Sequence, residues 1–241
     1  MAGFSHQEEN QNVFYLGKIV HDSGKSNGSR REFFQLGVEI LGSSGHETFG
    51  KIFSIISEIL KQSGFNKKLT VVIGNHSVFS EILEYLKLIP QYETELSGIL
   101  YAKDSARLEH FCRSKNIHGD FIRFFEALMF RFNPSEISKL GSSLLQRYRL
   151  DLERNISDTE NLLSMDVFSG KSNMDACVDF SLIRDLNYYT GFVFHAYCGN
   201  ISEPIFMGGA YDHLYAKFSG IEKPACGFAV TIDLLEDLIR T

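Results

Sequence analysis

Two short stretches of the sequence carry side chains that could hold a small polar ligand. In REFFQLGVEIL (31–41), Gln35 and Glu39 fall on the polar face of a predicted strand. At about 3.3 Å per residue their Cα atoms lie roughly 13 Å apart, which suits an amino-acid-sized ligand between them. Glutamate accepts hydrogen bonds from an ammonium or imidazole N–H, and glutamine can donate or accept. Gly37 leaves room for a ligand or a close backbone. The alternative is an ordinary solvated strand face.

The second stretch is RDLNYYTGFVFHAY (184–197), which joins a cation to two adjacent phenols. Arg184 could clamp a carboxylate through two parallel hydrogen bonds. The hydroxyls of Tyr188 and Tyr189 could hydrogen-bond an imidazole or an amine. A surface salt bridge beside two core phenols is the alternative that these residues leave open.

No set of catalytic residues emerges from the sequence. It contains no GxSxG, no P-loop and no HExxH segment. The four cysteines and eight histidines are scattered, without a CxxC pair. We therefore predict no catalytic residues, no cofactor and no structural metal.

Composition and charge narrow the class of protein. The chain has 241 residues and a formal net charge of −6, which argues against a broad basic face for nucleic acid. No apolar run approaches the roughly 20 residues that span a bilayer. The polar start MAGFSHQEENQN lacks the layout of a signal peptide. These features predict a cytoplasmic protein that binds neither nucleic acid nor membrane.

Periodicity predicts the elements that must position these side chains. Residues 15–20 and 31–41 are expected to form an antiparallel hairpin, with Phe34, Leu36, Val38 and Ile40 on its buried face. An amphipathic helix follows, with Ser44 and Glu47 as a capping box. A buried strand at 69–73 precedes a helix that Pro90 is expected to stop.

The remaining pattern divides the chain into three parts. Residues 1–66 are predicted to form the first part of the core, 67–165 a mostly helical inserted subdomain, and 166–241 the second part of the core. Aromatic clusters in the middle, such as FIRFFEALMF, are expected to be core. Strands, helices and strands again indicate an α+β fold with an antiparallel sheet and a helical insertion.

Four segments, taken in order, resemble the histidyl-tRNA synthetase family. GSRREFFQLGVEILG resembles motif 2, LIRDLNYYTGFVFHAY the histidine-binding signature, FMGGAYDHLYAKF the GGRYD segment and CGFAVTIDLLEDL motif 3. IGNHSVFSEIL is similar to a segment of ATP phosphoribosyltransferase regulatory subunits, which are paralogues of the synthetase, although Asn75 stands where a histidine is usual. The resemblance implies a class II aminoacyl-tRNA synthetase-like antiparallel sheet flanked by helices.

The departures from this pattern point away from adenylate chemistry. Positions that carry ATP-binding arginines in the synthetases hold His21, Ser29 and Leu234 here, and Ser23 replaces a glutamate. Neither imidazole nor an isobutyl group replaces a fixed guanidinium charge. Four signature positions are also altered, to Asp185, Asn187, His195 and Ala210. The chain begins just before motif 2, so motif 1 is expected to be missing.

The resemblance implies a non-catalytic regulatory subunit of ATP phosphoribosyltransferase. It would form a hetero-oligomer with the short-form catalytic subunit, enable the first step of histidine biosynthesis and transmit feedback inhibition by L-histidine. The implied histidine-binding residues are those that match the amino-acid pocket: Gln35, Glu39, Arg184, Tyr188 and Tyr189. By the same resemblance, Arg184 would hold the carboxylate, Gln35 the α-amino group, and Glu39 with the tyrosines the imidazole.

Two other functions stay open. One is a divergent enzyme that activates or ligates an amino acid on the same core. The other is a degenerate paralogue that binds a partner and no ligand.

Overall fold

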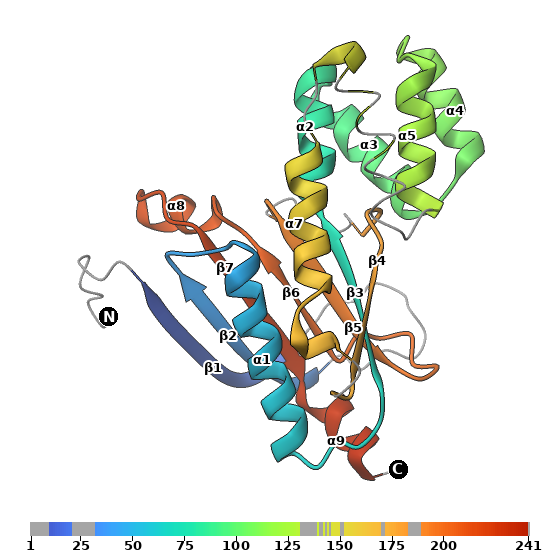
Figure 1. Cartoon of the computed structure of the whole chain (residues 1–241). Coiled ribbons are helices and arrows are strands. Elements are labelled where there is room, and N and C mark those ends of the chain that lie inside the picture. Colours follow the sequence, from blue (N-terminus) through green and yellow to red (C-terminus); the bar gives the residue numbers. More distant parts are fainter. Residues whose placement is uncertain are drawn as a thin grey trace.

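A twisted sheet crosses the protein, and helices gather on it and beyond one end of it (Figure 1). The computed structural model describes residues 10–20, 32–130, 139, 142, 144, 146–149, 152–169, 172–182 and 189–240. The strands are β1 (Gln11–Val20), β2 (Glu32–Leu41), β3 (Leu69–Asn75), β4 (Met174–Val178), β5 (Phe192–Cys198), β6 (Phe206–Ala210) and β7 (Ala225–Thr231). The helices are α1 (His46–Gln62), α2 (His76–Leu86), α3 (Pro90–Tyr101), α4 (Ser105–Ser114), α5 (Gly119–Phe130), α7 (Glu153–Leu163), the 3₁₀ turn η1 (Asp166–Phe168), α8 (Leu214–Ser219) and α9 (Ile232–Arg240).

The seven described strands follow the order β1-β2-β7-β6-β5-β3-β4. All neighbours are antiparallel except β3 and β4, which run parallel. The predicted α+β fold with an antiparallel sheet and flanking helices is thus confirmed, with one parallel pair at the edge. The last strand of this edge, β4, ends at Val178. Asp179 then turns the chain by accepting from the backbone N–H and the hydroxyl of Ser181.

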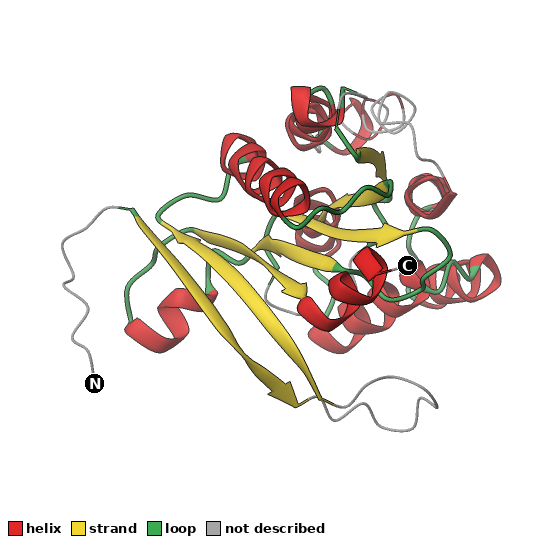
Figure 2. Cartoon of the chain, turned by 90° about the horizontal axis from the view of Figure 1, so that it is seen from below, coloured by secondary structure: helices red, strands yellow, loops and turns green. Residues whose placement is uncertain are grey.

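The predicted hairpin of β1 and β2 is confirmed, and its two strands extend past the helices (Figure 2). Leu36, Val38 and Ile40 pack against the core that α1 covers. Phe34, expected on the same buried face, is instead 50% exposed. The reason is local: β7 pairs with β2 only as far as Gln35, because the chain then turns into α9. The connection of the hairpin, 21–31, lies outside the described residues.

The long helix α1 is confirmed, but its predicted cap is wrong. Gly45 is the N-cap and no side chain caps it, so Ser44 and Glu47 do not form a capping box. The hydroxyl of Ser43 instead pairs with that of Thr48 at 2.5 Å. Pro90 was also misplaced: α2 ends earlier, at the left-handed Lys87, and Pro90 begins α3. Proline suits a first helical turn, where its missing N–H has no partner to lose.

The helices α2 to α5 pack around a second apolar core, which part of α7 completes. Phe121, Phe124 and Phe125 are buried within it, which confirms that the FIRFFEALMF cluster is core. The division of the chain at residues 66 and 165 stays a prediction. Within the predicted insertion, β3 hydrogen-bonds to β5 and β4 and so belongs to the main sheet.

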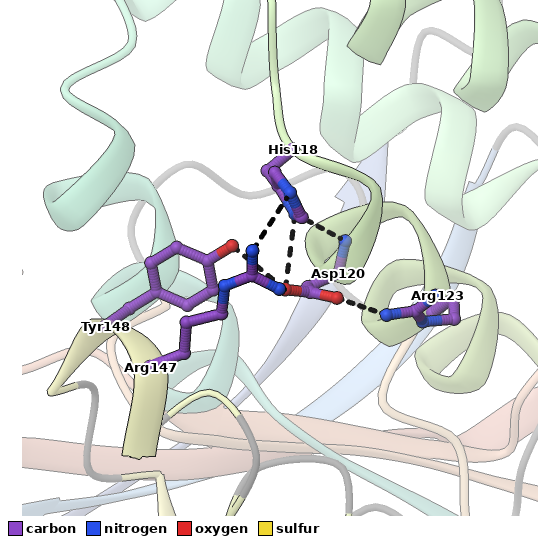
Figure 3. Close-up of polar contacts among 5 residues, drawn as sticks. All are labelled: His118, Asp120, Arg123, Arg147 and Tyr148. Carbon is purple, nitrogen blue, oxygen red and sulfur yellow. Dashed lines mark hydrogen bonds and ion pairs between the residues drawn. The ribbon is translucent and has the colours of Figure 1, made fainter.

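One carboxylate joins the start of α5 to the segment that precedes α7 (Figure 3). The side chain of Asp120 is only 11% exposed. Its Oδ2 accepts from Arg147 Nη1 at 2.7 Å and from the Tyr148 hydroxyl at 2.9 Å, and its Oδ1 accepts from Arg123. His118 Nδ1 lies 3.2 Å from Oδ2.

These neighbours set the charge state of the Asp120 carboxyl. Burial alone would raise its pKa, but the Tyr148 hydrogen bond and the nearby Arg147, His118 and Arg123 charges together hold the pKa below its ordinary value. A carboxyl whose folded pKa is depressed stabilises the fold above its unfolded pKa, and this contribution disappears as the pH falls through the folded pKa.

We therefore expect Asp120→Asn to lower the thermal unfolding midpoint at pH 7 by more than Glu109→Gln does. Glu109 belongs to an exposed pair with Arg113, and such helix pairs contribute only about 0.3–0.5 kcal/mol. The gap between wild type and Asp120→Asn should close as the pH falls below 3.8, the ordinary pKa of this group. Thermal unfolding followed by circular dichroism across pH 7 to 3 measures this gap, and a constant gap would contradict the assigned charge interactions.

Candidate functional site

The candidate site lies on the face of the sheet opposite α1. Because side chains alternate along a strand, burial of Leu36, Val38 and Ile40 against the core turns Gln35 and Glu39 to the other face. Glu39 is paired with Gly227 on β7, and Gly227 with Gly209 on β6. Two glycines therefore continue the row that starts at Glu39.

Glu39 is held over this row by a tyrosine. The Tyr211 hydroxyl donates to Glu39 Oε2. A Cβ placed on Gly227 would overlap that same oxygen, so only glycine admits the carboxylate here. Burial raises the pKa of the Glu39 carboxyl, and the Tyr211 hydrogen bond opposes the increase. A ligand that donates an N–H or carries positive charge would stabilise the ionised form further.

Tyr189 occupies the other end of the row. Its ring lies against Gly209, where a Cβ would come within 2.5 Å of a ring carbon. With neighbouring strands about 4.8 Å apart, the Cα atoms of Glu39 and Gly209 are separated by roughly 10 Å. The structure thus brings together two of the five predicted residues, Glu39 and Tyr189.

Gln35 has a neighbour that the sequence pattern did not indicate. The Tyr15 hydroxyl donates to Gln35 Oε1 at 3.1 Å. The Tyr15 ring covers Gly37, where a Cβ would come within 2.1 Å of it. The space left by Gly37 therefore takes a side chain of β1. Arg184 and Tyr188, the other two predicted residues, lie outside the described residues, as do the altered positions Asp185 and Asn187.

Tyr211 is the site residue that reasoning from single segments missed. It follows β6 directly, and its backbone N–H donates to Ala225 O at 2.7 Å, which fixes the start of its side chain beside β7. The GGAYD segment carried the only sequence signal for it. In that segment, Ala210 is a buried core residue, and Asp212 accepts a hydrogen bond from Thr190 Oγ1 at 2.8 Å.

Asn75 and His195 were also marked by the sequence as unusual. The Asn75 side chain caps α2 by accepting from Ser77 N, and its amide donates to the backbone oxygen of Asn155 at 3.0 Å. His195 lies on the candidate-site face of β5, and its Nδ1 is 3.1 Å from the Tyr197 hydroxyl. Asn75 lines a cavity of about 310 Å³ that also reaches Thr190 and Asp212.

The described residues also bear on metals, thiols and membranes. In these parts of the chain, no three His, Cys, Asp or Glu side chains come together as a metal ion would need. Burial, helped by the charges of Asp212 and Glu39, raises the pKa of the Cys226 thiol to about 12, so it stays protonated at neutral pH. None of the described helices has the length and hydropathy to cross a membrane.

The amino-acid sequence is similar to one protein family and to named members of it. The family model described as histidyl-tRNA synthetase matches residues 1–235. The ATP phosphoribosyltransferase regulatory subunit of Leptospira interrogans serovar copenhageni is 39% identical over 244 residues, which cover 100% of this chain and 70% of that protein. The similarity to this relative therefore extends along the whole chain.

Solved structures share the fold. The ATP phosphoribosyltransferase regulatory subunit/histidyl-tRNA synthetase from Bacillus halodurans C has a TM-score of 0.74 at 24% identity, over 95% of this chain and 58% of that one. The ATP phosphoribosyl transferase (HisG:HisZ) complex from Thermotoga maritima has a TM-score of 0.66 at 20% identity, over 94% of this chain and 74% of that one. The family model and the Leptospira protein together show that this chain belongs to the histidyl-tRNA synthetase family and, within it, is a relative of the ATP phosphoribosyltransferase regulatory subunits.

Proposed function

We propose that this chain is the regulatory subunit of an ATP phosphoribosyltransferase, that it is not itself an enzyme, and that it binds L-histidine. The observation that carries the assignment is the 39% identity, along the full chain, to a protein of that name. The match covers 70% of the length of that relative. The activity of the whole complex and its partner are therefore part of the proposal. The T. maritima complex supports a partner that is the catalytic subunit of the same enzyme.

In the motif 3 segment, the residue at the position of the ATP-binding arginine supports the absence of adenylate chemistry. Leu234 stands at the position that carries an ATP-binding arginine in the synthetases. In this chain it packs against the apolar core from α9 and offers no charge to a triphosphate. His21, Ser23 and Ser29, the other altered positions, lie outside the described residues.

The Glu39 end of the site supports recognition of an imidazole. A carboxylate whose pKa is raised by burial gains most from a ligand that donates an N–H to it. Tyr211 fixes the carboxylate, and the Tyr189 ring provides an aromatic wall at the other end of the glycine row. Gln35 for the α-amino group, and Arg184 and Tyr188 for the rest of the ligand, complete the proposed pocket.

Regulation then requires that histidine distinguish two states of the assembly. A ligand shifts an equilibrium only as far as its affinities for the two states differ. In the proposed complex, histidine binds the inhibited assembly more tightly than the active one. The catalytic subunit would respond through its contacts with this chain, in the cytoplasm.

Glu39→Gln should weaken histidine binding roughly tenfold or more, because hydrogen bonds to a charged group contribute about 1.5–3 kcal/mol. The matched control is Glu32→Gln, which lies on the same strand but on the opposite face, in an exposed pair with Lys18. Isothermal titration calorimetry with L-histidine measures both affinities. Equal affinity in wild type and Glu39→Gln would remove Glu39 from the pocket.

Tyr211→Phe should weaken histidine binding more at low pH than at high pH. The Tyr211 hydrogen bond lowers the pKa of Glu39, so its loss raises that pKa and leaves less carboxylate ionised as the pH falls. Affinities of variant and wild type are compared at each pH, so that the titration of histidine itself cancels. A ratio that does not change with pH would contradict the proposed role of the ionised carboxylate.

The assembly itself is tested by adding this chain to a short-form catalytic subunit from the same source. Phosphoribosyltransferase activity should appear only with both proteins and fall as histidine rises. Activity that does not change with histidine would contradict the proposed histidine pocket but would still support the proposed partner.

The alternative function, an enzyme that activates an amino acid, is tested by ATP–pyrophosphate exchange, which this chain alone should not catalyse.

A further inference from the structure

A second cavity, of about 430 Å³, lies between the first turns of α2, the start of α8 and the Tyr189–Thr190 segment. It is lined by His76, Ser80, Tyr189, Thr190, His213, Leu214 and Lys217. Neither Gln35 nor Glu39 lines it, and among the described residues it shares only Tyr189 with the proposed histidine pocket. Its volume falls within the range of about 300–1,000 Å³ that small-molecule pockets occupy.

Two helices each present a pair of residues four positions apart to this cavity. His76 and Ser80 lie one above the other on α2, and His213 and Lys217 do so at the start of α8. The two imidazoles and the ammonium therefore approach the same space from two separate elements. Among the described residues that line the cavity, none carries a carboxylate.

Several of these groups retain unused hydrogen-bonding capacity. Among the described residues, neither the half-buried His76 ring nor the Lys217 ammonium makes a hydrogen bond or ion pair, whereas the His213 ring approaches Glu222 Oε2 at 3.5 Å. Thr190 Oγ1 is already committed, because it donates to Asp212 Oδ2 and accepts from Asp212 N. The groups available to a ligand are thus chiefly nitrogen donors.

A cavity whose described lining offers nitrogen donors and no carboxylate favours an anion. A carboxylate presents two oxygens in one plane, whereas a phosphate monoester presents three oxygens around a tetrahedral centre and carries more charge. Three donors from two facing helices match the phosphate better. We propose that this cavity binds a small phosphorylated ligand, whose phosphate contacts His76, His213 and Lys217.

Inorganic phosphate is the probe for this site, and histidine is left out of the experiment, so the result does not depend on the histidine pocket. In protein labelled with ¹⁵N-histidine, NMR should show saturable shifts of the imidazole signals of His76 and His213 as phosphate is added. His76→Gln and His213→Gln assign the two signals. The absence of a saturable shift at either imidazole would overturn the proposal.

Lys217→Gln should weaken phosphate binding roughly tenfold or more, since it removes a charge-assisted contact. Lys51→Gln, at another exposed helical lysine on α1, is the matched control and should bind phosphate as wild type does. Lys217 is exposed, so the variant is expected to fold, and its thermal midpoint checks this. Equal phosphate affinity in the two lysine variants, or tighter binding of acetate than of phosphate at equal ionic strength, would overturn the assignment.

Discussion

The alternation of side chains along β2 is the constraint on which the rest of the structure depends. One face of this strand must bury Leu36, Val38 and Ile40 under α1, because that contact closes the apolar core. The other face is then committed to Gln35, Gly37 and Glu39. A slip of one residue in the pairing of β2 would exchange the two faces. Core packing and the position of the Glu39 carboxylate are therefore fixed by the same register.

Close packing across the sheet imposes the second requirement, which is the absence of side chains at Gly209 and Gly227. The Tyr189 ring and Glu39 Oε2 occupy the places where Cβ atoms would stand. Glycine in a strand normally weakens it, because the unfolded chain loses more freedom and no side chain packs. Here the two glycines let two larger polar side chains lie flat across neighbouring strands. The stability that the strands lose at these two glycines is therefore a requirement of the site.

The sequence predicted those features that depend on local periodicity. The hairpin, α1 and β3 follow from alternation or helical spacing within one segment, and the class II architecture follows from four ordered motifs. The sequence could not predict features that depend on distant partners. The Tyr15 ring fills the space at Gly37, and Tyr211 reaches Glu39, through pairings between strands far apart in the chain. Helix ends were also misjudged, because Gly45 rather than Ser44 is the N-cap of α1 and Pro90 begins α3 instead of ending α2.

Under the proposed function, the same reasoning explains how a synthetase fold could lose adenylate chemistry and keep the Glu39 end of the site. The position of the motif 3 arginine now holds Leu234, whose side chain contributes to the core between α9 and the sheet. Such an exchange removes a charge and adds apolar contact with the core, which favours folding. Glu39 has no such freedom, because its half-buried carboxylate already depends on Tyr211 and on the glycine row. Loss of the motif 3 charge is therefore compatible with the packing of the core, whereas the Glu39 end of the site depends on Tyr211 and on the two glycines.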